Sequence, residues 1–305
     1  MDSKLEQLKK MTLVVADTGD LAAIQRYQPQ DATTNPSLIL KALALEAYQP
    51  LLAQARAQQG VPLYDAFAAL VAVQIQQQVP GYVSVEVDAR TSYSVEASRT
   101  RAHQLIELIQ RAGGDPKRIL IKLAATWEGI QAAAALEQEG IACNLTLLFG
   151  QEQAKACADA GVTLISPFVG RILDWYQARY PEQDWSGERD PGVQSVRKIY
   201  QEYKAQGYAT IIMGASFRNL SQIELLAGCD RLTLAPALLE ALAQEHAPLA
   251  TQLGAVPAQE RCPVLTEAVF RQQLADHQMA QEKLQEGIAL FSADLEKVEA
   301  VLAQA

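Results

Sequence analysis

The chain has 305 residues, of which 49% are hydrophobic and 20% are charged, and its formal net charge is −9. This length suits two ordinary domains or one large α/β barrel, and the composition is that of a globular protein with a sizeable core. The acidic balance argues against a general nucleic-acid or anionic-membrane surface, although a local basic pocket for one phosphate stays open.

The first ten residues are charged and helical in pattern, without the apolar run of a signal peptide. No apolar segment reaches the roughly 18 residues of a membrane span. The four cysteines contain no C-x-x-C pair, and the three histidines do not lie beside them. We therefore expect a cytoplasmic protein with neither a disulfide framework nor a metal site.

Apolar runs of strand length alternate with helical patterns along the chain. They fall at residues 13–19, the start of 32–40, 81–90, 118–125, 142–149, 163–170, 210–216 and 231–236. Eight such units favour a closed (β/α)8 TIM barrel. A doubly wound sheet is the alternative, but both the G-x-G-x-x-G fingerprint and the P-loop are missing from the sequence.

Two further segments complete this outline. Residues 180–191 (YPEQDWSGERDP) are polar and rich in turn residues, which predicts an exposed loop on the barrel. Residues 288–302 have apolar positions at helical spacing and could pack across one end of the barrel. We expect residues 1–305 to form a single catalytic barrel domain with extra terminal helices.

Polar side chains share one face of several predicted strands. In the third strand Val83, Val85 and Val87 alternate with polar residues. The outer face of a barrel strand packs on helices, so the valines should point outward and Glu86 inward. The same alternation groups other polar residues near strand ends: Asp17, Thr33, Asn35, Lys122, Asn144, Thr146 and Ser166. Each alone could be a hydrogen-bonded core or cap residue.

Lys122 lies among apolar residues near the end of the fourth strand. Burying a lysine costs hydration, so cores admit one mainly when it is paired or when its amine is used. Either Lys122 is a Schiff-base nucleophile, or its stem packs while its head reaches water. Arg171 and Arg218 follow the sixth and seventh strands, where barrel loops often hold phosphate, although many arginines are merely solvated.

Two stretches resemble the signatures of the transaldolase family, residues 31–39 (DATTNPSLI) and 119–130 (ILIKLAATWEGI). The likeness extends from VVADTGD at 14–20 to LTLAPALL at 232–239. The resemblance implies a (β/α)8 barrel of the non-oxidative pentose phosphate pathway that needs no metal or organic cofactor. Such an enzyme transfers a dihydroxyacetone unit from sedoheptulose 7-phosphate or fructose 6-phosphate to glyceraldehyde 3-phosphate or erythrose 4-phosphate. The resemblance also implies a homodimer.

The resemblance further implies roles for individual residues. Lys122 would form the imine, and Asp17 would remove the C4 hydroxyl proton as the C3–C4 bond breaks. Glu86, with Thr146 holding a water, would handle protons as the carbinolamine forms and breaks down. Residues that would position the donor or the covalent intermediate are Thr33, Asn35, Asn144 and Ser166, and those that would bind phosphate are Arg171, Ser216 and Arg218.

Small departures from the family pattern touch none of these roles: Ala125 stands where serine is frequent, and Gly150 where small polar residues are common. Imine formation needs a neutral amine, whereas nearby ionised carboxylates favour the ammonium. We therefore expect at least one of Asp17 and Glu86 to be neutral, distant or hydrogen-bonded in the resting protein.

Phe168 shares a predicted face with Ser166 and could keep the site dry, or it could simply pack in the core. A tyrosine at this position in the resembling family goes with fructose 6-phosphate aldolase activity, so phenylalanine favours transfer. Three other functions stay open: an aldolase that releases dihydroxyacetone, a catalytically silent sugar-phosphate-binding barrel, and an interaction scaffold.

Overall fold

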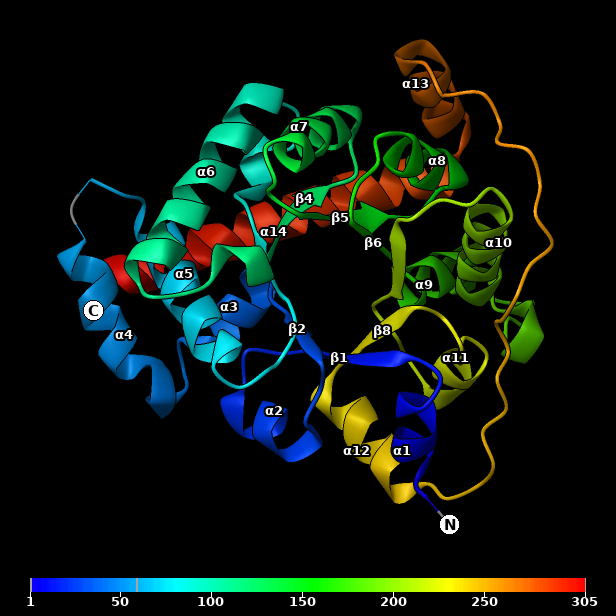
Figure 1. Ribbon diagram of the computed structural model, residues 1–305, viewed down its shortest axis with the longest axis horizontal. Coiled ribbons are helices and arrows are strands. Elements are labelled where there is room, and N and C mark those ends of the chain that lie inside the picture. The colour runs from blue at the N-terminus through cyan, green and yellow to red at the C-terminus, as the bar shows by residue number, and fades with distance from the viewer. Residues whose placement is uncertain (1, 59, 305) are drawn as a thin grey trace.

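The computed structural model describes residues 2–58 and 60–304. Eight parallel strands close into a barrel in chain order, with helices around it (Figure 1). The strands are β1 (Leu13–Asp17), β2 (Asp31–Thr33), β3 (Val83–Glu86), β4 (Ile119–Ala124), β5 (Cys143–Leu148), β6 (Leu164–Pro167), β7 (Ile211–Gly214) and β8 (Arg231–Leu234). Each overlaps a predicted stretch. The predicted (β/α)8 barrel is confirmed, because β8 pairs with β1 and leaves no open edge.

Helices follow most strands, as the alternating pattern predicts. The α-helices are α1 (Lys4–Lys9), α2 (Leu21–Tyr27), α3 (Pro36–Ala42), α4 (Gln49–Ala57), α5 (Leu63–Gln76), α6 (Val95–Arg111), α7 (Trp127–Gln138), α8 (Gln151–Asp159), α9 (Gly170–Arg179), α10 (Pro191–Ala205), α11 (Leu220–Glu224), α12 (Pro236–Gln244), α13 (Glu267–Asp276) and α14 (Gln278–Gln304). Short 3-10 helices are η1 (Glu46–Tyr48), η2 (Ala89–Thr91), η3 (Pro116–Arg118) and η4 (Gly187–Arg189). In the described part of the chain, no helix is both long and apolar enough to cross a membrane.

The apolar core has two shells separated by the barrel wall. Val83 and Val85 belong to the large cluster between the strands and the outer helices, which confirms that the valines point outward. A small inner cluster, Val15, Leu120, Leu164 and Met213, fills the barrel floor. Each fully buried side chain of this size contributes roughly 1.5–3 kcal/mol to folding. Because residues two apart share a face, these floor residues direct positions 17, 122 and 166 into the barrel above them.

The C-terminal helix α14 lies across the barrel end that carries the carboxyl ends of the strands. It contacts α3, α5, α9, β5 and η2, and it appears in Figure 1 as the red helix behind β4 and β5. Its buried residues include Ile288, Phe291 and Leu295. The helical stretch predicted at 288–302 is therefore part of α14, which packs against β5 and the neighbouring helices.

The polar segment between α9 and α10 is exposed over most of its length, which confirms the predicted loop. It ends at Asp190, which is buried and caps α10 by accepting from the backbone N–H groups of Gly192 and Val193. The loop is thus anchored at its end by Asp190.

Candidate active site

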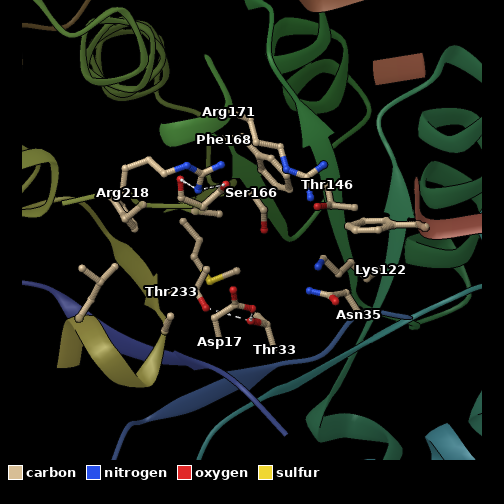
Figure 2. Close-up of a pocket in the computed structure, with 17 residues that line it drawn as sticks. Asp17, Thr33, Asn35, Lys122, Thr146, Ser166, Phe168, Arg171, Arg218 and Thr233 are labelled. Carbon is tan, nitrogen blue, oxygen red and sulfur yellow. Dashed lines mark hydrogen bonds between the residues drawn. The ribbon is translucent and has the colours of Figure 1, made fainter. Parts of the chain in front are cut away.

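A cavity of about 190 Å³ opens at the carboxyl end of the barrel (Figure 2). Ten residues expected from the sequence line it: Asp17, Thr33, Asn35, Lys122, Thr146, Ser166, Phe168, Arg171, Ser216 and Arg218. Glu86 and Asn144 are also buried and touch lining residues without lining the cavity themselves. The structure therefore brings all twelve together.

Strand register explains how residues distant in sequence meet. Glu86 on β3 pairs in register with Lys122 on β4, and Lys122 pairs with Asn144 on β5. All three side chains consequently project from one level of the wall. Two residues further along, Ala124 pairs with Thr146, which puts the threonine one layer nearer the barrel mouth.

Lys122 is 5% exposed and has no short polar contact. Its Nζ lies 3.4 Å from Glu86 Oε2 and 3.4 Å from the carbonyl oxygen of Thr34. A strong charge-assisted hydrogen bond would be about 2.7–2.9 Å long. The amine is therefore held loosely at the cavity wall and stays available to a ligand. The alternative of a half-buried lysine whose head reaches water does not fit a side chain that is buried almost completely.

The two carboxyl groups near Lys122 differ in their partners. The Thr33 hydroxyl donates to Asp17 Oδ1 over 2.9 Å, and Thr33 Oγ1 also lies 2.9 Å from Thr233 Oγ1. Burial raises the pKa of Asp17, against the opposing effects of Lys122 and the Thr33 hydrogen bond. Burial also raises the pKa of Glu86, again opposed by Lys122. The expectation that at least one carboxyl is hydrogen-bonded is confirmed by Asp17.

A short chain of hydrogen bonds holds the wall beside the lysine. Asn144 Nδ2 donates to Ser84 Oγ over 3.1 Å, and the Ser166 hydroxyl donates to Asn144 Oδ1 over 2.6 Å. These bonds fix the orientation of the Asn144 amide. Thr146 Oγ1 is buried and has no hydrogen-bond partner among the described residues. This hydroxyl can therefore form a hydrogen bond with a small ligand or a water.

Two arginines line the side of the cavity away from Asp17 and Thr33 (Figure 2). Arg218 Nη2 pairs with Asp174 over 2.6 Å, and its Nη1 donates to Ser216 Oγ over 3.3 Å. Burial lowers the pKa of Arg171, and repulsion from Arg218 adds to this. Two neighbouring guanidinium groups suit an anion with several oxygens, such as phosphate.

The backbone at this end is tightly built. Ser216 has φ of 61°, a left-handed conformation that is uncommon for residues other than glycine. Its carbonyl accepts from the Gly170 N–H over 2.7 Å. A Cβ on Gly170 would lie 2.3 Å from that same oxygen. Only glycine allows β6 and β7 to approach this closely and bring Arg171 and Ser216 together.

Sequence reasoning missed several residues that line the cavity: Met213, Ala215, Phe217, Thr233, Ala235, Leu238 and Phe291. Thr233 was detectable, because it lies between the apolar residues Leu232 and Leu234 of the eighth strand and alternation puts it on the opposite face from them. Phe291 had no local signal, since it reaches the cavity from a helix at the far end of the chain.

The fold and the site together define a (β/α)8-barrel enzyme with a lysine buried in its barrel. Residues 14–302 match the sequence model of the family described as transaldolase/fructose-6-phosphate aldolase. The chain is 53% identical to a transaldolase of Actinobacillus succinogenes and to transaldolase A of Pasteurella multocida, over 99% of both chains in each comparison. A transaldolase of Haemophilus influenzae is also 53% identical over 99% of both chains. The chain therefore belongs to the transaldolase/fructose-6-phosphate aldolase family.

Proposed function

We propose that this chain is a transaldolase that moves a dihydroxyacetone unit from a ketose phosphate to an aldose phosphate through an imine on Lys122. The observation that carries the proposal is the loosely held Lys122 amine, which lies 3.4 Å from Glu86 and lines a cavity together with Asp17 and two arginines. The donors would be sedoheptulose 7-phosphate or fructose 6-phosphate, and the acceptors glyceraldehyde 3-phosphate or erythrose 4-phosphate.

Imine formation begins when Lys122 Nζ attacks the C2 carbonyl of the ketose to form a carbinolamine. Loss of water then gives the imine. Glu86 Oε2, 3.4 Å from Nζ, is near enough to exchange protons with the reacting nitrogen. A water on the unpaired Thr146 hydroxyl would relay these protons, because that oxygen has no partner among the described residues.

Carbon–carbon cleavage needs a base at the C4 hydroxyl. Asp17 fits this role, because Thr33 holds its carboxylate at the cavity wall. As Asp17 takes the proton, the C3–C4 bonding electrons move into the protonated imine, which becomes an enamine, and the aldose leaves. The acceptor aldehyde is then attacked by the enamine, Asp17 returns the proton to the new hydroxyl, and hydrolysis frees Lys122.

The remaining polar residues would hold the substrate in register. Thr33, Asn35, Asn144 and Ser166 would position the donor hydroxyls or the covalent intermediate, and their fixed hydrogen bonds reduce the cost of ordering the site. Arg171, Ser216 and Arg218 would bind the phosphate.

We also propose that the whole chain acts as one catalytic domain, because the C-terminal helix contributes Phe291 to the cavity. The cytoplasmic location and the homodimer stay predictions. Sedimentation of the purified protein at micromolar concentration tests the dimer, and a mass equal to one chain would contradict it.

The deciding experiment is borohydride reduction of the protein with fructose 6-phosphate, followed by peptide mass mapping. We expect a three-carbon adduct on Lys122, because reduction converts the imine to a stable secondary amine. Lys122→Met, which keeps the stem and removes the amine, is the control and should carry no adduct. A folded protein that binds the sugar phosphate yet gains no adduct would be a silent binding barrel.

A further inference from the structure

Arg171 is held in place differently from its neighbour Arg218. Arg218 forms an ion pair with Asp174. No hydrogen bond or ion pair joins the Arg171 side chain to any residue in 2–58 or 60–304. Its guanidinium carbon instead lies over two aromatic rings, 5.1 Å from the centroid of Phe168 and 5.4 Å from that of Phe291. Both distances are within the range of cation–π attraction.

This arrangement leaves the binding capacity of Arg171 intact. A guanidinium carries its N–H donors in its plane, whereas an aromatic ring contacts its face. Rings can therefore orient the group without using the donors that an anion needs. A carboxylate partner would both occupy donors and neutralise charge, as Asp174 does for Arg218. Arg171 is partly buried, so the attraction is stronger here than at an exposed site.

Both rings are themselves fixed by packing. Phe168 is 6% exposed and meets Phe149 edge-on, with ring centroids 5.3 Å apart. Phe291 is 2% exposed in the same apolar cluster. It lies one turn after Gly287, where a Cβ would come within 2.6 Å of a Leu147 methyl carbon. The close approach of α14 to β5 at that point sets how deep the Phe291 ring sits.

We propose that Phe291 is a positioning residue for the phosphate subsite: it acts through Arg171, and it makes the C-terminal helix part of substrate recognition. This inference rests on the proposed function for its substrate, a sugar phosphate, but the subsite itself can be tested without lysine chemistry. Phe291 is the residue to change in this test, because Phe168 also lines the reacting end of the cavity beside Ser166.

The test compares Phe291→Leu, which keeps apolar volume and removes the ring, with Phe291→Tyr, which keeps the ring. Phe270→Leu is the matched control, because Phe270 on the adjoining helix α13 is also almost fully buried, packs on Trp127 and is not among the residues that line the cavity with Arg171 and Arg218. Three readouts are needed: calorimetric affinity for inorganic phosphate, KM and kcat for fructose 6-phosphate, and borohydride trapping with dihydroxyacetone, which carries no phosphate.

We expect Phe291→Leu to weaken phosphate binding about tenfold and to raise KM by a similar factor. It should leave kcat and dihydroxyacetone trapping close to those of the unaltered chain, because Lys122 is untouched. Phe291→Tyr and Phe270→Leu should bind phosphate normally. Phosphate affinity unchanged in Phe291→Leu, or lost equally in Phe270→Leu, overturns the proposal. If Phe291→Leu does not fold, Phe291→Met replaces it, with the same expectation and the same contradicting result.

The two proposals fail in different ways. Absence of a Lys122 adduct in the unaltered chain, together with the tenfold loss of phosphate affinity in Phe291→Leu, rejects the imine chemistry and keeps the subsite. An adduct that forms normally, with no phosphate binding by the unaltered chain, rejects the subsite and keeps the chemistry.

Discussion

Phe168 illustrates how much a single side chain can decide in this site. Its ring lines the cavity beside Ser166 and is nearly buried, and it backs onto Phe149. It offers no proton and no hydrogen bond to a water. We propose that the ring lengthens the life of an enamine in this cavity, because it neither supplies a proton nor orients a water for hydrolysis.

Phe168→Tyr should therefore shift the reaction from transfer toward release of free dihydroxyacetone, by about tenfold, because the added hydroxyl can orient a water or supply a proton. The measurement is free dihydroxyacetone formed from fructose 6-phosphate with and without erythrose 4-phosphate. Phe217→Tyr adds the same hydroxyl elsewhere in the cavity wall and serves as the control. Unchanged partitioning in Phe168→Tyr would refute a role for Phe168 in protecting the enamine.

At the scale of elements, α14 packs against the barrel beside the cavity, which it lines with Phe291. Ion pairs and hydrogen bonds attach it along its length: Glu299 binds Arg90, whose guanidinium also pairs with Asp88, and Glu282 accepts from Trp175 Nε1 over 2.7 Å. These contacts lie near the surface and are individually weak. The apolar contact at Gly287 brings the helix against Leu147 of β5 one turn before Phe291.

Gly287→Ala should destabilise the protein by about 1–3 kcal/mol, because the added methyl meets buried Leu147 and forces α14 outward. Helix propensity acts in the opposite direction by about 1 kcal/mol. Urea unfolding measures the difference, and KM for fructose 6-phosphate should rise as Phe291 moves. Ala289→Gly, on the exposed side of α14, reports helix propensity alone. A more stable Gly287→Ala would mean that the helix has room at this point.

At the scale of the whole molecule, a buried charge cluster joins parts of the chain that are far apart. Asp65 on α5 is fully buried, and its Oδ2 lies 3.1 Å from Arg101 Nη1 on α6. Arg101 also contacts Asp88, which follows β3. The Asp65 contact is an ion pair without a well-aligned hydrogen bond, so it offsets burial only in part. Burial consequently raises the pKa of Asp65 from 3.8 to about 6.

This shift makes folding stability depend on pH. The folded state binds the Asp65 proton more tightly than the unfolded state. The stabilisation of the fold by protonated Asp65 is therefore complete below pH 3.8 and is lost as pH rises through about 6. The loss amounts to about 3 kcal/mol. Asp65→Asn cannot ionise, so its stability relative to the unaltered chain should increase by about that amount from pH 4 to pH 7. Urea unfolding across this range checks it, and a pH-independent difference would contradict it.

Much of the site was predictable because strand alternation is a local property. The floor residues Val15, Leu120 and Leu164 direct Asp17, Lys122 and Ser166 into the barrel, and that pattern is legible in the strands themselves. Family signatures added the expected roles. Thr233 could have been found by the same alternation, whereas nothing local marked Phe291.

The sequence by itself determined the eight strands, the inward face of the first six, and therefore most of the polar residues that share the barrel. These follow from periodicity and from short-range sterics, which act within a few residues. Tertiary structure alone decided the register that sets Lys122 opposite Glu86, the hydrogen bond that engages Asp17, and the two rings that hold Arg171. Those contacts join residues that meet only after the barrel closes and α14 packs across it, so no local pattern encodes them.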